Sequence, residues 1–245
     1  DITKISQLRK KINENFDHVI NLSGYIDHSN KIANYNCHFL GTKNILKSLK
    51  LKNLKTFIQV GSSLEYGKTN SPQREKNNCK PVGSYGLSKY NASKFVMKLG
   101  RTKNLPYIIL RPYQVFGPNQ KINRLIPQTI FSCLKNKKFK CSIGTQLRDF
   151  IYIDDFYNLL KKIIQNSNIR KDIFNIGSGK PVSVKFIINK INFIIKKGKP
   201  QFGSIPMRKD EIKNLYPSIK KVKRKFLWSP KISLMSGLKK TIKFY

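Results

Sequence analysis

Acidic side chains are scarce in this chain of 245 residues, in which 12 Asp and Glu stand against 49 Lys and Arg and give a formal net charge of +37. Such an excess attracts polyanions, for example nucleic acid, an acidic membrane surface or phosphorylated metabolites. The lysines are spread along the whole chain and do not gather in a tail. A dedicated polyanion patch should be clustered, so biased composition is the better explanation and a nucleic-acid partner is not expected.

The chain also lacks long apolar runs and paired cysteines. No apolar stretch approaches the roughly 18–20 residues that a membrane helix needs, and no secretory signal opens the sequence. The four cysteines, Cys37, Cys79, Cys133 and Cys141, include no CxxC pair and no metal-like grouping with histidine. These absences predict no membrane span and no metal site, and they favour a reducing, cytoplasmic environment.

Apolar runs of strand length alternate with amphipathic stretches of helix length. Continuous apolar strands separated by helices are typical of a parallel sheet covered on both faces. We therefore predict an α/β, doubly wound, Rossmann-like fold. The predicted strands, with the turns that follow them, are residues 18–24, 56–63, 107–117 and 172–179, and the predicted helices are 1–16, 36–50, 84–100 and 184–197.

Tyr85 and Lys89 are four residues apart, which places both side chains on one face of the predicted helix. Free tyrosine titrates near 10, and a lysine ammonium one turn away would lower that pKa by favouring the phenolate. A hydroxyl from Ser62 or Ser63, at the neighbouring strand end, can hydrogen-bond a substrate oxygen. Such a set removes an alcohol proton while hydride leaves the carbon, or does the reverse. Alone, the spacing is weak evidence, because a lysine-rich chain often produces it by chance.

Seven short motifs occur in a specific order along the chain. They are NLSG (21–24), GSSLEYG (61–67), SYGLSK (84–89), ILRPYQVFGP (109–118), LRDFIYIDD (147–155), FNIGSG (174–179) and FLWSPKIS (226–233). In this order they resemble the extended short-chain dehydrogenase/reductase superfamily and, more narrowly, its NAD-dependent nucleoside-diphosphate-sugar epimerase/dehydratase family. The resemblance covers nearly the whole chain.

The resemblance implies a role for individual positions. Ser62, Tyr85 and Lys89 match the catalytic serine, tyrosine and lysine. The matches for binding NAD or NADP are Asp1 and Ile2 at the adenine ring, Leu22, Ser23 and Gly24 along the cofactor, Asn36 at the start of the next helix, Tyr113 near the nicotinamide, and Tyr85 and Lys89 themselves. The matches on the substrate side are Ser63, Gln114, Arg124, Arg148 and Arg208.

The three arginines also have a physical interpretation. A guanidinium fork binds phosphate through two hydrogen bonds, and Arg124, Arg148 and Arg208 match places where this family holds the nucleotide diphosphate. Read alone, any one of them is better explained as a solvated charge. Gln114 departs from the asparagine that the family often has at its position.

The resemblance narrows the reaction without fixing it. The 4,6-dehydratase branch carries an Asp-Glu pair directly after the catalytic residue, where this chain has Ser63 and Leu64, and Glu65 should project to the opposite side. Dehydration is therefore not expected. Epimerisation at C4 is the leading prediction, and reduction of a 4-keto sugar is the alternative because it uses the same Ser-Tyr-Lys site. A non-catalytic fragment that binds RNA or other polyanions is the alternative from another class.

The Gly-rich turn that holds the cofactor diphosphate in this family is missing from the sequence. The resemblance implies that the first strands are absent, which would leave an open sheet edge and weaken NAD binding by the chain alone. Residues 1–118 and 150–180 are expected to form a partial NAD-binding domain, and residues 119–149 and 181–245 the sugar-nucleotide-binding region. Family members also form homodimers through the helices at 36–50 and 84–100.

Four further residues have structural interpretations. Asp149 is expected to orient nearby backbone, and Asp154 or Asp155 to cap the following helix. Trp228 is expected to pack in the interior instead of stacking on a ligand.

Overall fold

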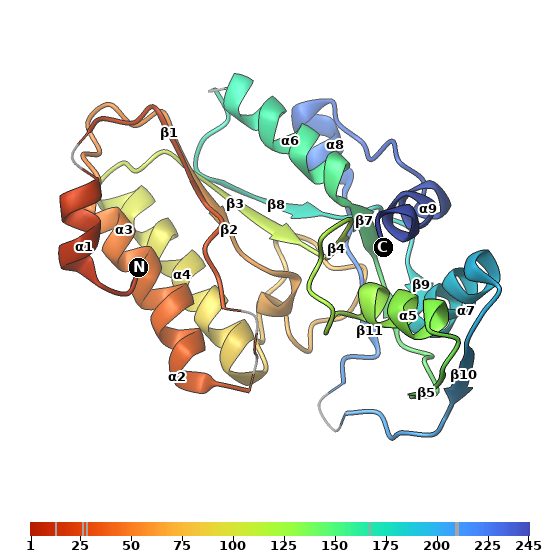
Figure 1. Ribbon diagram of the computed structural model, residues 1–245. Helices are drawn as coiled ribbons and strands as arrows, with labels where there is room; N and C mark the ends of the chain where they lie inside the picture. Colours follow the sequence, from red (N-terminus) through yellow and green to blue (C-terminus); the bar gives the residue numbers. More distant parts are fainter. Residues whose placement is uncertain (13, 26, 28, 167, 209–210) are drawn as a thin grey trace.

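The centre of the protein is a parallel sheet of four strands (Figure 1). The computed structural model describes residues 1–12, 14–25, 27, 29–166, 168–208 and 211–245. The strand order is β1-β2-β3-β8, and the strands are β1 (His18–Asn21), β2 (Thr56–Val60), β3 (Tyr107–Pro112) and β8 (Asp172–Ile176). All three neighbouring pairs are parallel. The predicted α/β fold is confirmed.

Helices cover both faces of this sheet. Successive residues of a strand point to opposite faces, and here apolar side chains point to both, so both faces must be buried. Phe57 on β2 packs with Ile45 and Val96 on one face, whereas its neighbour Ile58 belongs to the core on the other face. The helices of the first face are α1 (Ile5–Lys11), α3 (Gly41–Ser48) and α4 (Gly83–Thr102), and those of the second are α6 (Ile153–Gln165) and α8 (Lys220–Phe226). The arrangement is doubly wound, as predicted.

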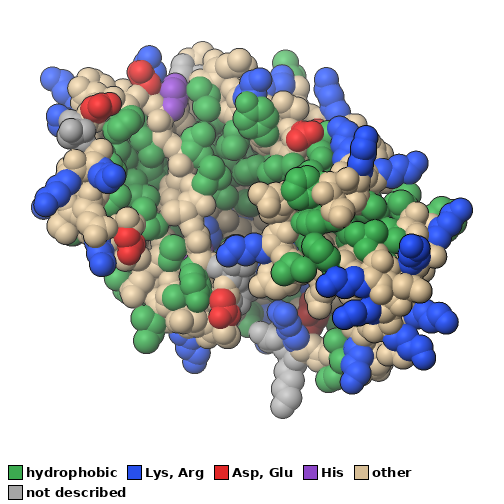
Figure 2. Space-filling model, in the orientation of Figure 1, with side chains coloured by type: hydrophobic (Ala, Val, Ile, Leu, Met, Phe, Trp, Pro, Cys, Tyr) green, Lys and Arg blue, Asp and Glu red, His purple; other side chains and the backbone are tan. Residues whose placement is uncertain are grey.

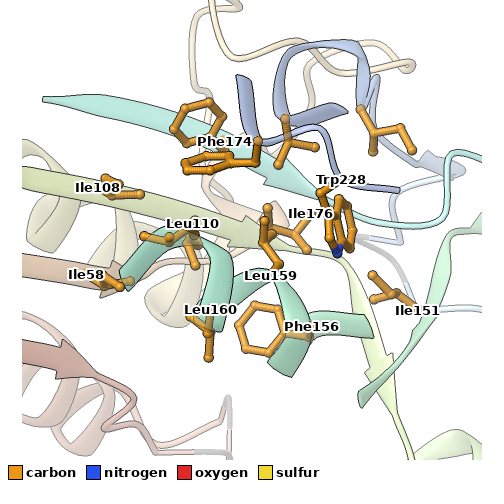
Figure 3. Packing of buried hydrophobic residues seen from close by; sticks show 14 residues of the cluster. Ile58, Ile108, Leu110, Ile151, Phe156, Leu159, Leu160, Phe174, Ile176 and Trp228 are labelled. Atoms are coloured by element: carbon orange, nitrogen blue, oxygen red, sulfur yellow. The ribbon is translucent and has the colours of Figure 1, made fainter. Parts of the chain in front are cut away.

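The core of the second face gathers segments that are far apart in sequence (Figure 3). Leu110 from β3 and Leu159 from α6 meet there with Trp228, which follows α8. Trp228 is only 4% exposed, so its predicted role in packing is confirmed. Residues 220–228 therefore pack against the sheet, although the sequence assigns them to the sugar-nucleotide-binding region.

The helical segment before β2 begins earlier than predicted. Asn30 caps it with a side chain that accepts a hydrogen bond from Ala33 N at 2.9 Å, and helix α2 runs over Lys31–Asn34. A π-helical segment, η1 (Tyr35–Leu40), leads directly into α3. The predicted start at Asn36 is wrong, because the cap lies six residues upstream and Asn36 is inside the helical run.

The rest of the chain forms a second region with its own core. Its helices are α5 (Leu125–Leu134), α7 (Val184–Ile195) and α9 (Leu234–Phe244). Its strands pair as β4 (Gln114–Phe116) with β7 (Phe150–Tyr152), β5 (Lys138–Cys141) with β10 (Lys199–Phe202), and β6 (Leu147–Arg148) between β9 (Val182–Ser183) and β11 (Asn214–Leu215). Ile130, Ile187 and Leu238, one from each helix, are fully buried in its core.

Three expectations from the sequence concerned the distribution of charge, an open edge of the sheet and the absence of a membrane span. Figure 2 shows Lys and Arg side chains spread around the outline of one face, without a single dominant cluster. Among the described residues, β1 has β2 as a neighbour on one side and no strand on the other. Within that same part of the chain, none of the helices combines the length and the apolar character needed to cross a bilayer.

Candidate active site

A cleft of about 610 Å³ lies at the carboxyl ends of the central strands. Open α/β sheets bind ligands at this edge because the loops that leave the strands diverge there. One wall consists of the loops that follow β1, β2 and β3, together with the start of α4. The facing wall comes from the second region and includes Arg124, Arg148, Arg208 and Leu215.

Most of the residues singled out in the sequence line this one cleft. They are Leu22, Ser23, Gly24, Ser62, Ser63, Tyr85, Lys89, Tyr113, Gln114, Arg124, Arg148 and Arg208. These positions are distant in sequence. The fold brings them together because loops after β1, β2 and β3, helix α4 and the second region all border the same edge of the sheet.

Asp1, Ile2 and Asn36 are not among the residues that line the cleft. The Asp1 carboxylate accepts hydrogen bonds from the backbone and hydroxyl of Thr3 at 2.9 and 2.8 Å. The Ile2 carbonyl accepts a bond from Asn44 on α3 at 3.0 Å. Asn36 lies inside η1. Their assignment to cofactor binding stays a prediction.

Ser62 is held by a capping box at the end of β2. The short 3-10 helix η2 (Ser63–Glu65) begins after Ser62, whose hydroxyl accepts a hydrogen bond from Leu64 N at 3.1 Å. The backbone N–H of Ser62 donates to the Glu65 carboxylate at 2.9 Å. The Ser62 side chain is also near enough to the Tyr85 hydroxyl to favour its phenolate by hydrogen bonding. The two predicted catalytic hydroxyls therefore lie near each other in the cleft.

Helix α4 presents Tyr85 and Lys89 to the cleft from consecutive turns. It approaches η2 closely because Gly86 has no side chain; a Cβ at this position would lie 2.7 Å from the Leu64 carbonyl oxygen. The Lys89 ammonium donates to the Val60 carbonyl at 2.9 Å. An ammonium has three donors, and this is its only hydrogen bond in the described part of the chain.

The pKa values of this pair differ from the sequence expectation. Burial raises the pKa of Tyr85, although its hydrogen bond with Ser62 and the charge of Arg124 act in the opposite direction. Burial also lowers the pKa of Lys89 to about 8, opposed by the nearby Glu65 carboxylate. The expectation that Lys89 lowers the pKa of Tyr85 below its usual value is wrong for this structure, because desolvation of the phenolate is the largest effect and the opposing effects come from Ser62 and Arg124.

Lys89→Met is expected to stabilise the fold by about 1–2 kcal/mol near neutral pH. Keeping an ammonium charged when its pKa falls from 10.5 to about 8 costs about 3 kcal/mol, and the unpartnered Val60 carbonyl then costs about 1–2 kcal/mol. Because the folded-state pKa is the lower one, the wild type regains this stability as the pH rises from about 8 to 10.5. Urea unfolding at neutral and alkaline pH measures the difference. Lys98→Met, on the exposed face of α4, is the control, and equal pH profiles for Lys89→Met and wild type would contradict the prediction.

Tyr113 borders the cleft, but its hydroxyl and its backbone N–H are hydrogen-bonded to groups in the interior. Its hydroxyl donates to the buried Gln73 side chain at 2.6 Å, and burial raises its pKa. Its backbone N–H donates to the Ile176 carbonyl at 2.9 Å. The hydroxyl is therefore occupied in this structure, and its predicted contact with a cofactor would use other atoms of the residue.

Arg124, Arg148 and Arg208 form what we call the arginine wall of the cleft, and a carboxylate neutralises one of these three charges. Arg148 is buried, pairs with the Glu211 carboxylate and donates to the Leu147 carbonyl at 2.7 Å. Arg124 and Arg208 are exposed. Two cations of this wall thus face the solvent of the cleft, whereas the third is held by an internal carboxylate.

Among the cleft residues that sequence reasoning missed are His38 and Glu211. Glu211 stands three residues after Arg208, and no feature of the sequence distinguishes it. His38 is brought inward by the π-helical segment, which the sequence did not predict. The expectation for Glu65 is confirmed, because its carboxylate points away from the cleft into the interior and pairs with Arg111 at 3.0 Å.

The acidic residues of the 149–155 segment have structural partners. Asp149 accepts hydrogen bonds from Ser178 N and Gly179 N at 2.5 and 2.7 Å, so it orients backbone as predicted. Asp155 accepts bonds from the backbone of Lys231 and Ile232. Neither Asp154 nor Asp155 caps α6, because the cap position is Tyr152. The capping prediction is wrong.

Comparison with known sequences identifies the relatives of the chain. The NAD dependent epimerase/dehydratase family matches residues 1–177. A putative UDP-glucose 4-epimerase of Methanocaldococcus jannaschii is 30% identical over 96% of the chain and 79% of its own length. A dTDP-D-glucose 4,6-dehydratase of Dictyostelium discoideum is 32% identical over 73% of the chain and 45% of its own length.

Solved structures share the fold across the whole chain. The UDP-glucose 4-epimerase of Thermotoga maritima, solved with UDP-glucose, has a TM-score of 0.93 at 22% identity and covers 100% of this chain and 82% of that one. The Bordetella bronchiseptica enzyme WbmG, solved with NAD and UDP, has a TM-score of 0.88 at 20% identity and covers 100% and 78%. The resemblance inferred from the motifs is confirmed: the chain belongs to the NAD-dependent epimerase/dehydratase family.

Proposed function

We propose that this protein is an NAD(P)-dependent nucleoside-diphosphate-sugar epimerase that acts at C4 of the sugar. The observation that carries the proposal is that Ser62, Tyr85 and Lys89 line one cleft together with three arginines of the second region. Acid–base groups and phosphate-binding groups therefore face each other across one space.

The residues present fit a nicotinamide dinucleotide on the β1 side of the cleft. Leu22, Ser23 and Gly24 line that side, and the buried Lys89 ammonium has donors beyond its bond to Val60, suited to ribose hydroxyls. The cleft volume is within the roughly 300–1,000 Å³ of small-molecule sites. A bound NAD supplies hydride transfer to and from carbon.

The proton chemistry falls to the side chains of the chain itself. Tyr85 takes the proton from the sugar C4 hydroxyl and later returns it, while the Ser62 hydroxyl holds the same oxygen. We assign to Lys89 the role of favouring the phenolate by its positive charge, although burial works against both charged forms. A bound cation near Tyr85, such as an oxidised nicotinamide, would lower the pKa of Tyr85.

Epimerisation fits the cleft better than dehydration. Elimination of water needs an acid and a base beside the sugar, and the described lining contains a single carboxylate, Glu211, which pairs with Arg148. Ser63 and Leu64 supply neither group, and Glu65 is turned into the interior. The alternative of a 4-keto-sugar reductase uses the same Tyr85 and Ser62 and differs only in whether reduced cofactor is consumed.

The diphosphate of the substrate is assigned to the arginine wall. Arg124 and Arg208 are exposed at the cleft, and Arg148 becomes available when its bond with Glu211 opens. Paired guanidinium donors suit phosphate oxygens. Gln114 and Ser63 line the same cleft and are assigned to the sugar hydroxyls.

The wider assignments extend this proposal. We place the enzyme in the cytoplasm, in surface polysaccharide or nucleotide-sugar synthesis, and its four cysteines are free thiols. A homodimer through η1, α3 and α4 is consistent with the exposed Tyr35 and Leu87 on these helices, whereas Val96 belongs to the interior. The division of the chain into residues 1–118 with 150–180 and residues 119–149 with 181–245 remains part of the proposal.

A panel of nucleotide sugars tests the function. The full-length protein is incubated with NAD and UDP-, dTDP- or CDP-hexoses, and products are separated chromatographically and identified by NMR. Interconversion of C4 epimers without net cofactor consumption is the expected result, because the hydride is returned. Stoichiometric oxidation of NADPH with a 4-keto sugar would establish the reductase instead, and a 4-keto-6-deoxy product or no turnover would refute the epimerase.

A further inference from the structure

His38 occupies an unusual position in the helical run before β2. The π-helical segment η1 places its ring in the cleft, where it is only 2% exposed, and its carbonyl accepts a bond from Thr42 Oγ1 at 2.7 Å. Single π-helical turns insert an extra residue and redirect side chains, and they are frequent at functional sites. The local helix geometry thus delivers this imidazole to the proposed site.

One side of the His38 ring holds the loop that follows β1. Its Nε2 lies 3.0 Å from the Tyr25 carbonyl oxygen and 3.4 Å from the Tyr25 backbone nitrogen, so it can bond the Tyr25 backbone in either tautomer. Gly24 packs against the ring, since a Cβ there would lie 3.1 Å from His38 Cε1. This is the loop along which the cofactor is proposed to run.

The other side of the ring contacts the proposed catalytic tyrosine. The centroids of His38 and Tyr85 are 4.9 Å apart at an interplanar angle of 84°, an edge-to-face arrangement. Such pairs favour a defined ring orientation. The His38 ring thus restrains the Tyr85 ring, while the Tyr85 hydroxyl is near Ser62.

We propose that His38 is a positioning residue that couples the cofactor-side loop, residues 22–25, to the orientation of Tyr85. Its two roles use different parts of the side chain: Nε2 anchors Tyr25 of the loop, and the ring orients Tyr85. The inference rests on the proposed function for its catalytic consequence. Its structural consequence, a link between the loop and the phenol, does not require turnover.

Two substitutions separate these roles. His38→Phe keeps an aromatic ring against Tyr85 and removes the hydrogen bond to the Tyr25 backbone, so the Kd for NAD is expected to rise about tenfold with kcat largely kept. His38→Gln keeps an amide that can donate or accept this bond and removes the ring, so kcat is expected to fall about tenfold with the Kd for NAD largely kept. His18→Gln, on β1 and outside the lining of the cleft, is the matched control.

The readouts distinguish failure of the inference from failure of the proposed function. NAD affinity is measured by calorimetry, and ionisation of Tyr85 by ultraviolet difference titration against Tyr85→Phe, so neither needs a substrate. If the wild type turns over no sugar nucleotide, a rise in Kd confined to His38→Phe and a changed Tyr85 titration confined to His38→Gln still support the coupling. Equal losses in both variants, as for general destabilisation, or no change in either, would overturn it.

Discussion

Tyr85→Phe is expected to lower kcat/KM of the full-length enzyme by about 10²–10⁴-fold, the usual contribution of one general acid–base group. The substitution removes the only atom of Tyr85 that exchanges a proton, and it also removes the partner of the Ser62 hydroxyl. The ring and its edge-to-face contact with His38 remain. Binding of NAD and of the nucleotide sugar should therefore be close to that of the wild type.

Tyr90→Phe provides the matched control for this experiment. Tyr90 is one turn beyond Gly86 on the same helix, lies outside the cleft lining, and contacts Lys94 at 5.5 Å from the ring centroid. Steady-state kinetics with the active sugar nucleotide and near-neutral buffer measures both variants. Activity of Tyr85→Phe within a few-fold of the wild type would contradict the assignment of the proton to Tyr85.

Breaking the buried ion pair beneath Ser62 is expected to cost about 3–5 kcal/mol of unfolding free energy. Glu65 and Arg111 are almost fully buried and 3.0 Å apart, and the Arg111 guanidinium also lies over the ring of Tyr66 at 4.5 Å. Arg111→Met leaves the Glu65 carboxylate without its counter-charge. Because this carboxylate also accepts the Ser62 N–H, the loss should reach the site as well as the core.

Chemical denaturation of Arg111→Met, Glu65→Leu and the double variant measures this pair. The double variant should recover part of the loss, because it leaves no uncompensated buried charge. Asp17→Asn is the comparison, since Asp17 and Lys55 pair at 2.9 Å with side chains 62% and 56% exposed, and such pairs contribute little. A loss for Arg111→Met as small as that for Asp17→Asn would refute the prediction.

The fold and the position of the cleft at the carboxyl ends of the strands could be predicted from the pattern of apolar residues. The apolar runs at 56–60 and 107–112 are buried on both faces, which only a covered parallel sheet allows, and residues directly after such strands must meet at one edge. Ser62 could be assigned to the cleft on that basis, whereas Gln114 was implied by the resemblance to the family. The YxxxK spacing added Tyr85 and Lys89 once a helix was expected there.

The parts that could not be predicted depend on tertiary burial. The spacing of Tyr85 and Lys89 says nothing of desolvation, which reverses the expected direction of the Tyr85 pKa. The position of His38 depends on a π-helical turn without a sequence signal. The pairing of Arg148 with Glu211 joins residues 63 positions apart, and only the folded chain places them in contact.

The close packing of Gly86 on the Leu64 carbonyl has a consequence for how this site can diversify. The spacing between the serine-bearing turn and the tyrosine-bearing helix is set by the absence of a side chain, since even one methyl group would meet a carbonyl oxygen at 2.7 Å. The packing of α4 against η2 therefore fixes the distance between the Ser62 and Tyr85 hydroxyls. New substrates can be accommodated by rebuilding the arginine wall, which belongs to other segments, while the proton-transfer geometry stays unchanged.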